Sequence, residues 1–239
     1  MTVLVPARRL DAELLDRPDN HPEDLHAALR DIRHVNRLLG GESILLDALR
    51  PLLDGVPRGG AVEILDVGTG MGDLALAMAR LARASGRDPR VVAVDIDPVT
   101  VEAASRHTAE DGSVRVLRAD ALRLPFRDGS FDFVTCSMFL HHFDPASVAT
   151  LLSSFRSIAR RFVVVNDLRR HLVPWAFIGL AARVTRRHPM FVHDAPLSVL
   201  RGFTDGELRE AASRAGEPAA TVRRRWPFRL VLTLRGAAA

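Results

Sequence analysis

The stretch of residues 62–80 constrains the fold most, because it joins the signatures of a strand, a glycine turn and a helix. A short and mostly apolar run at 64–67 meets Gly68, Gly70 and Gly72, and an alanine- and leucine-rich segment follows. Glycines at the start of a helix let backbone approach a ligand closely. In a parallel sheet this ligand lies outside the carboxyl ends of the strands. We therefore expect an α/β sheet with a ligand site at this turn; the alternative is a tight turn without a ligand.

The spacing of the three glycines separates two classes of ligand. The dinucleotide fingerprint is G-x-G-x-x-G, whereas this chain has G-x-G-x-G with an acidic residue two positions before the first glycine. The acidic-x-Gly-x-Gly-x-Gly pattern resembles motif I of the class I S-adenosylmethionine-dependent methyltransferases. The resemblance implies S-adenosylmethionine as cofactor and S-adenosylhomocysteine as product. The residues of this stretch that it assigns to the cofactor are Asp66, Gly68, Thr69, Gly70 and Gly72.

The next strand ends in a second acidic residue. Residues 91–94 form an apolar, β-branched run of the buried-strand type and lead into Asp95. An acidic group about 20 positions beyond the glycine turn suits a ribose diol, because one carboxylate can accept from two hydroxyls. Asp95 is therefore predicted to bind the ribose, and Ile96 to cover a face of the adenine. Asp97 is predicted to cap the helix that follows.

The third and fourth strands extend the resemblance to roughly residues 60 to 170. In the family, the acidic position after the third strand and the residue next to it contact the adenine, and Asp120 and Ala121 match them after the strand at 114–118. The segment at 124–132, Leu-Pro-Phe-Arg-Asp-Gly-Ser-Phe-Asp, is typical of the small-molecule branch. Ser137, after the strand at 133–136, completes the expected cofactor-binding set.

The fold class implied is α/β, a Rossmann-like seven-stranded methyltransferase sheet with helices on both faces and an antiparallel C-terminal hairpin. Periodicity and end signals place the remaining elements. Helices are expected at 73–84, 99–106, 146–159 and 206–215, the fifth strand at 162–165, and the hairpin strands at 221–225 and 229–234. Thr204 and Glu207 have the spacing of a capping box.

Residues 1–59 are predicted to form an N-terminal helical cap over the cleft, ahead of a methyltransferase domain at 60–239. A short helix is expected at 11–15, and apolar positions at helical spacing indicate longer helices at 23–39 and 43–53. Two interpretations stay open for the longer ones. They cover one face of the sheet, or they lie over the cofactor cleft. In the second case two side chains would reach the acceptor, Asn36 and Arg37.

Residues 169–203 depart from the common core and are expected to be an acceptor-side insertion. Residues 172–184 form an almost uncharged helical segment, and residues 186–196 are predicted to be a loop with aromatic and imidazole groups. An apolar helix beside histidines suits an aromatic acceptor, whereas an extra core or dimer helix is the alternative. The acceptor-binding candidates of the insertion are Trp175 and His193.

Two adjacent histidines follow the fourth strand, where the family places the edge of the active site. Methyl transfer is an in-line displacement, so the protein mainly has to hold the acceptor in line and exclude water. A phenol gains from losing its proton, which an imidazole can accept. His142 is predicted to be this base and His141 is the second choice, with Asp167 and His193 behind them; the alternative is that the histidines cap or pack. No cluster shows metal-ligand spacing, so no metal is expected.

The acceptor is predicted from the resemblance. Methyltransferases of flipped nucleic-acid bases commonly carry Asn/Asp-Pro-Pro-aromatic after the fourth strand, but this chain has Ser-Met-Phe-Leu at 137–140. The sequence segments at 13–16 and 36–40 resemble those of bacterial small-molecule methyltransferases of the ubiquinone/menaquinone type. Some of these enzymes accompany polyketide pathways. This predicts O-methylation of a small phenolic or quinone-like metabolite in secondary metabolism. Three alternatives stay open: C-methylation of a similar acceptor, a non-methylating protein that binds S-adenosylmethionine, and a nicotinamide-dependent oxidoreductase.

Composition limits location and partners. The one cysteine, Cys136, excludes an internal disulfide and a thiolate cluster. No apolar run of membrane-spanning length and no signal peptide is found, so we expect a cytoplasmic protein without stable membrane insertion. The pI of 10.8 arises because every basic side chain is arginine, while the net charge is only +4. The arginines are scattered, so no nucleic-acid partner is expected. Whether the chain forms a homodimer stays open.

Overall fold

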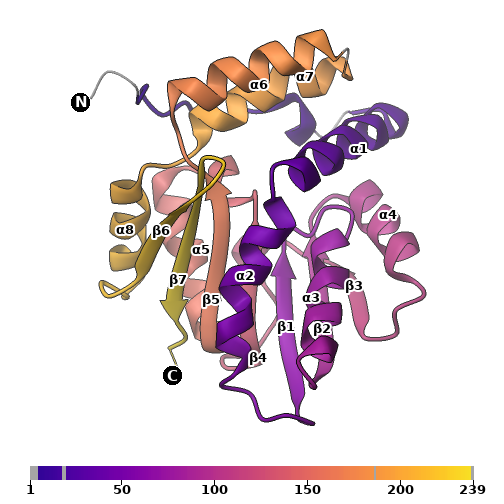
Figure 1. Cartoon of the computed structure of the whole chain (residues 1–239), viewed down its shortest axis with the longest axis vertical. Coiled ribbons are helices and arrows are strands. Elements are labelled where there is room, and N and C mark those ends of the chain that lie inside the picture. The colour runs from indigo at the N-terminus through magenta and orange to yellow at the C-terminus, as the bar shows by residue number, and fades with distance from the viewer. Residues whose placement is uncertain (1–4, 18–19, 186, 238–239) are drawn as a thin grey trace.

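The computed structural model describes residues 5–17, 20–185 and 187–237 of the 239. The chain start, on which the expectation of no signal peptide depends, and Arg186 of the expected loop lie outside these residues. Within the described part the strands form one seven-stranded sheet in the order β3-β2-β1-β4-β5-β7-β6. Strands β1 to β5 are parallel, and β7 is antiparallel to both β5 and β6 (Figure 1). This confirms the predicted fold class and its C-terminal hairpin.

The elements lie close to the predicted ranges. The strands are β1 (Ala61–Val67), β2 (Asp88–Asp95), β3 (Val114–Arg118), β4 (Phe131–Ser137), β5 (Ala159–Leu168), β6 (Thr221–Arg225) and β7 (Arg229–Arg235). The α-helices are α1 (Pro22–Leu38), α2 (Gly41–Leu53), α3 (Asp73–Ala84), α4 (Pro98–Thr108), α5 (Pro145–Ile158), α6 (Leu172–Val184), α7 (Pro189–Arg201) and α8 (Asp205–Arg214). Three single 3-10 turns are η1 (Leu14–Asp16), η2 (Ala121–Arg123) and η3 (Leu140–His142).

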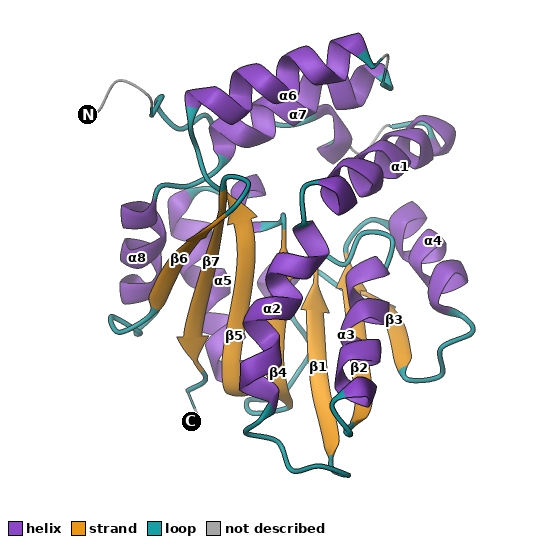
Figure 2. Cartoon of the chain, viewed as in Figure 1, coloured by secondary structure: helices purple, strands orange, loops and turns teal. Residues whose placement is uncertain are grey.

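Helices cover both faces of the sheet (Figure 2). Alternate side chains of the central strand enter opposite cores: Ile64 packs with α2 and α3, while Leu65 packs with α5 and α8. A parallel strand buried on both faces requires a nearly continuous apolar run, and β1 has one interrupted only by Glu63 and Asp66. The sheet therefore holds the carboxyl ends of β1 to β5 on one rigid edge.

Each of the two N-terminal helices fits a different one of the two interpretations. Helix α2 buries Leu45, Leu49 and Leu53 against one face of the sheet. Helix α1 instead lies beyond the carboxyl ends of the strands, on the same side of the sheet as α6 and α7 (Figure 1). The expected helix at 11–15 is only the short turn η1.

The predicted loop at 186–196 is wrong for the part that is described, because Pro189–Arg201 form helix α7. The segment contains two prolines, which disfavour the interior of a helix. However, Pro189 occupies the first helical turn, where proline costs no hydrogen bond. Pro196 lies inside the helix, opposite Gly179 of α6. Burial of side chains such as Phe191 and Val199 on neighbouring elements outweighs the weak local preference.

The predicted helix caps agree with the structure, in contrast to the predicted loop. Asp97 caps α4, accepting from the Thr100 N–H at 2.7 Å. Thr204 and Glu207 form the expected capping box of α8. Among the described helices, none combines the length and the apolar character that crossing a bilayer requires.

Candidate active site

The glycine turn lies between β1 and α3, and each of its three glycines has positive φ: 69° at Gly68, 56° at Gly70 and 79° at Gly72. A Cβ at Gly68 would collide with the Phe139 ring, and one at Gly72 would come within 2.8 Å of the Thr108 methyl. A Cβ at Gly70 would meet nothing within 4 Å. Two glycines therefore permit close packing, while the space over Gly70 is open to a ligand.

Asp66 stabilises this turn from inside the protein. It is 1% exposed and accepts from the Thr69 hydroxyl at 2.8 Å and from the Thr135 hydroxyl of β4 at 3.1 Å. Burial raises the pKa of Asp66 to about 7, because the two hydroxyl hydrogen bonds only partly compensate lost hydration. Asp66 and Thr69 thus come together in an arrangement that shapes the turn, while their contact with the cofactor stays a prediction.

Asp95 ends β2 beside the open glycine. Its carboxylate accepts from the Gly70 N–H at 3.2 Å and from the Asp97 N–H at 3.1 Å. Burial raises its pKa, while these backbone hydrogen bonds act in the opposite direction. Each carboxylate oxygen keeps a lone pair for a further donor. Ile96 follows with 59% of its surface exposed, so an apolar side chain stands next to this carboxylate without cover.

Asp120 lies at the neighbouring strand end. Asp95 pairs with Arg118 in the β2–β3 register, and Asp120 comes two residues later. Its side chain accepts from the Leu122 N–H at 2.9 Å, and Ala121 is buried beside it. The structure thus brings two carboxylates, an exposed apolar side chain and an open glycine to adjacent strand ends. This set fits a nucleoside, with hydroxyl and amine donors to the carboxylates and a flat base on the apolar side chain.

His141 is part of a buried hydrogen-bonded pair. It is 2% exposed, its Nδ1 lies 2.7 Å from Asp167 Oδ1, and its backbone N–H donates to the other carboxylate oxygen at 3.2 Å. Burial raises the pKa of Asp167, but the charge and hydrogen bonds of His141 outweigh it and the pKa lies below its usual value. The Nε2 atom of His141 lies 3.8 Å from Glu13 Oε1.

His142 is more accessible and faces a different carboxylate. Its side chain is 21% exposed, and Nδ1 lies 3.0 Å from Asp16 Oδ2. Burial lowers the pKa of His142, but the hydrogen bond to Asp16 and the negative charge of Glu13 outweigh it, so the pKa is raised. The two imidazole rings lie 4.3 Å apart between centroids.

Residues 5–17, which we call the N-terminal segment, cover these histidines. The prediction of a cap at 1–59 did not include these contacts. Helix α7 holds the N-terminal segment in place. Asp194 accepts from the backbone N–H groups of Leu14 and Leu15 at 2.8 and 2.9 Å, and Ser198 donates to Glu13 at 2.8 Å. Arg201, 3% exposed, donates to the His141 carbonyl at 3.0 Å and to the carbonyl of Asp11. No periodic signal marks such contacts between distant parts of a chain.

The same cluster contains a set of possible metal ligands. Glu13, His141 and His142 each offer one ligand atom, all within 4.8 Å of one another. However, the Arg201 Nε lies 3.7 Å from Glu13 Oε1, and its charge disfavours a cation there. The expectation of no metal stays a prediction.

A second polar group lies at the ends of β4, β5 and β7. The Asn166 amide donates to the Ser137 hydroxyl at 3.0 Å, and Arg229 reaches Asn36 Oδ1 at 3.4 Å and the sulfur of Met138. Arg229 is 2% exposed, and burial lowers its pKa to about 10. Two predicted residues, Ser137 and Asn36, thus meet an arginine and an asparagine that sequence reasoning missed.

The other acceptor-binding candidates are exposed. The side chain of His193 is 53% exposed and lies 2.8 Å from Asp194, and 41% of Trp175 is exposed. Arg37 is also exposed. Helix α6 turns Phe177 and other apolar residues to solvent and buries only Gly179 and Ala182, so it is not a core helix.

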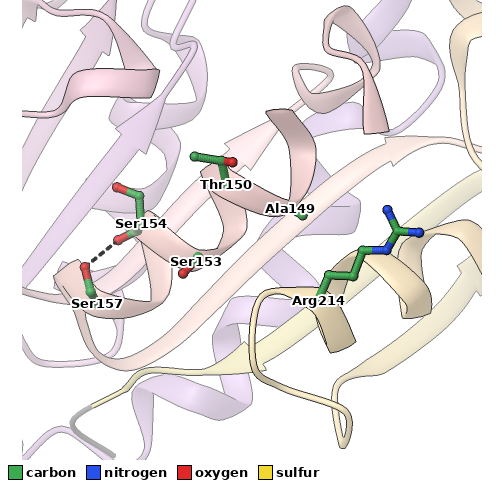
Figure 3. A pocket seen from close by; sticks show the side chains of 6 residues that line it. All are labelled: Ala149, Thr150, Ser153, Ser154, Ser157 and Arg214. Carbon is green, nitrogen blue, oxygen red and sulfur yellow. Dashed lines mark hydrogen bonds between the residues drawn. The ribbon is translucent and has the colours of Figure 1, made fainter. Parts of the chain in front are cut away.

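An open groove of about 520 Å³ lies between α5 and α8, and Figure 3 shows the side chains that line it. It is lined by Ala149, Thr150, Ser153, Ser154, Ser157 and Arg214. Helix α5 runs away from the carboxyl ends of the strands, so the groove does not adjoin the glycine turn. Its arginine is paired with Glu210 on the same helix, and the remaining lining side chains are small and neutral. The strand ends, rather than this groove, carry the candidate chemistry.

Comparison with known proteins indicates the family that this part of the chain resembles. Residues 64–161 match the family model described as a methyltransferase domain. This match confirms the resemblance of this part of the chain to a methyltransferase domain. A demethylmenaquinone methyltransferase of Thermus thermophilus is 46% identical over 82 residues, which are 34% of this chain and 36% of the relative. A ribosomal protein L11 methyltransferase of Pelobacter propionicus is 36% identical over 95 residues, 40% of this chain and 29% of the relative.

The methyltransferase domain also has solved structural neighbours. The fold of an S-adenosylmethionine-dependent methyltransferase from Aquifex aeolicus matches 92% of this chain and 100% of that one, with a TM-score of 0.60 and 18% identity. Family and topology together disfavour the nicotinamide-dependent alternative. The matched part spans about a third of the length of the two curated relatives. These relatives act on different acceptors by name, so the shared part does not identify the acceptor.

Proposed function

We propose that the protein is an S-adenosylmethionine-dependent methyltransferase that O-methylates a small phenolic or quinone-like metabolite. The observation that carries this proposal is the open Gly70 beside the Asp95 carboxylate, with Asp120 on the next strand. In the proposed complex Asp95 accepts from the ribose hydroxyls, Asp120 accepts from the adenine amine, and the N–H of Ala121 donates to a ring nitrogen. Ile96 covers the adenine face.

When bound, S-adenosylmethionine supplies an activated methyl group on a sulfonium. The chain then has to orient the acceptor, exclude water and receive a proton. We assign the proton to His142, because its ring is the more accessible of the two and Asp16 orients it through Nδ1. His141, with Asp167 behind it, is the second candidate. The N-terminal segment covers both histidines and so limits their contact with water.

The phenolic or quinone-like acceptor is supported by the similarity to a demethylmenaquinone methyltransferase and by the apolar residues of α6. C-methylation of a similar acceptor is the alternative, since loss of the same phenolic proton also makes a ring carbon nucleophilic. A non-methylating protein that binds S-adenosylmethionine is the second alternative.

Location and partners follow as proposals. A cytoplasmic location suits the free and buried Cys136. A small aromatic acceptor is the proposed partner, without nucleic acid and without stable membrane insertion. If a homodimer forms, the exposed apolar face of α6 around Phe177 is the surface we would assign to it.

Titration calorimetry tests the proposed function. S-adenosylmethionine should bind to the protein and NAD should not. Phenolic and quinol acceptors are then incubated with the labelled cofactor, and NMR of the product distinguishes O-methylation from C-methylation. Turnover should survive treatment with a chelator. Failure of S-adenosylmethionine to bind would overturn the proposal.

A further inference from the structure

Arg229 is a buried cation without a carboxylate partner among the described residues. It is the first residue of β7, 2% exposed, and its Nε has no hydrogen-bond partner. Its other contacts are weak: the sulfur of Met138 and, at 3.4 Å, the amide oxygen of Asn36. A guanidinium has five N–H donors, and leaving them unpaired away from water is costly. Among the described residues the charge of Asp167 acts on Arg229 without forming an ion pair, so the guanidinium N–H groups remain available to an added anion.

A second orphaned atom lies on the same face of the sheet. Asn166 is fully buried, and its Oδ1 accepts no hydrogen bond. Its Nδ2 donates to the Gly41 carbonyl at 3.0 Å, which fixes the orientation of the amide. Arg229 pairs with Leu168, two residues beyond Asn166 on β5. Side chains two apart lie on one face of a strand, so the orphaned acceptor and the orphaned donor are neighbours.

These two residues lie on the acceptor side of the proposed site. The nucleoside residues stand at the ends of β2 and β3 and the glycine turn ends β1, whereas β7 lies three strands beyond β1. At about 4.8 Å per strand this separation is about 14 Å. Met138, which contacts Arg229, directly follows β4 and has a φ of 57°, unusual for a residue other than glycine. Such conformations concentrate at functional sites.

We propose that Arg229 and Asn166 form the polar subsite for the acceptor. The Arg229 guanidinium binds an oxyanion of the acceptor, a carboxylate or a phenolate, and Asn166 Oδ1 accepts from a hydroxyl next to it. Guanidinium groups match planar oxyanions through paired N–H donors. This inference rests on the proposed function and adds the acceptor class: an aromatic ring with an oxyanion and an adjacent hydroxyl.

Binding of small aromatic probes tests the subsite, with and without S-adenosylhomocysteine. Salicylate carries a carboxylate beside a hydroxyl, and salicylamide is its neutral counterpart. 4-Nitrocatechol tests the phenolate source, since its absorbance reports ionisation. We expect the wild type to bind salicylate at least tenfold more tightly than salicylamide, or to bind 4-nitrocatechol as the phenolate. Arg229→Met should lose this binding, and Arg229→Lys should retain part of it.

Stability and cofactor binding provide the controls. Arg229→Met should keep the S-adenosylhomocysteine affinity within twofold and should keep or raise the Tm, because it removes an unpaired buried charge. Arg87→Met is the matched control. Arg87 is also buried, but it donates to the Val56 and Ser85 carbonyls at 3.0 and 2.7 Å, so its loss should lower the Tm.

Three results would overturn the subsite. The first is no preference for an oxyanion, or no probe binding, in the wild type. The second is loss of S-adenosylhomocysteine binding in Arg229→Met, which would assign the arginine to the cofactor carboxylate. The third is a fall in Tm as large as that of Arg87→Met. Failure of the wild type to bind S-adenosylhomocysteine would instead remove the proposed function, and the probe titrations without it would still test Arg229.

Discussion

Replacing Asp66 by asparagine should stabilise the protein, and it should do so more at alkaline pH than at acid pH. In the folded state burial raises the pKa of Asp66 from 3.8 to about 7. The folded protein therefore keeps a proton that the unfolded chain has already released, and between these two values the free energy of unfolding falls as pH rises. Asparagine is neutral at every pH and has nearly the same shape as aspartate. The Thr69 and Thr135 hydroxyls can bond to it because each can donate or accept.

The size of the effect follows from the shift. A difference of about 3 pKa units at about 1.36 kcal/mol each gives an upper limit of about 4 kcal/mol above pH 7. Relaxation around the carboxylate reduces this, so we expect about 2 kcal/mol at pH 8.5. For a chain of this length that is a rise in Tm of about 4 to 8 °C. At pH 4.5 the folded carboxylate is mostly protonated, but the carboxylate of the unfolded chain is already mostly ionised. This leaves a difference of about 1 kcal/mol, so the asparagine variant should melt about 2 to 4 °C higher than the wild type.

Thermal unfolding at pH 4.5 and pH 8.5 measures both values. Asp47→Asn is the control, since Asp47 is exposed on α2 and its substitution should leave the pH dependence unchanged. If Asp66→Asn loses the same stability at both pH values, the carboxylate is ionised and structurally required in the fold, and the reasoning is refuted.

Four further predictions concern the proposed site and the glycine turn. Asp95→Asn should weaken S-adenosylmethionine binding by about 10- to 100-fold in calorimetry, through weaker hydrogen bonds to the ribose, whereas Asp97→Asn should not; equal losses would contradict the ribose assignment. His142→Ala should lower methyl transfer by about 100-fold or more with cofactor affinity retained, and unchanged turnover would remove His142 as the base. Wild-type activity should keep rising as the pH increases above about 6.5. Only the neutral imidazole of His142 can accept the proton, and its raised pKa keeps part of it protonated at this pH. Gly68→Ala should lower the Tm by about 4 °C or more through strain and a clash with Phe139, while Gly70→Ala should additionally weaken cofactor binding.

Most of the fold was predictable because its signals are local. The run at 64–67, the β-branched residues 91–94 and the helix caps each act within a few neighbouring residues, and the structure places these elements within a few positions of the prediction. Helix α7 was missed because prolines dominate its local signal, whereas its stability comes from buried residues such as Phe191 and from hydrogen bonds of Asp194 to a segment about 180 residues away in sequence.

In the proposed site, too, local sequence signals predict one half, and contacts between distant residues form the other. Its cofactor half consists of residues that follow directly on predicted strands, so the pattern around Asp95 and Asp120 indicated it. Its acceptor half requires pairs such as Glu13 with His141 and Asn166 with Arg229, which only the folded chain brings together. Nothing in the spacing of single residues marks them in advance.

This division also explains what the relatives share. The family match ends at residue 161, before Asn166, Asp167 and Arg229, and begins after the N-terminal segment. Relatives named for different acceptors can therefore share the matched part, since it contains the proposed nucleoside residues and lacks Asn166 and Arg229. If the acceptor half sets specificity, exchanging the N-terminal segment or α7 between relatives should alter acceptor choice and leave cofactor affinity unchanged. Altered cofactor affinity with unaltered acceptor choice would contradict the division.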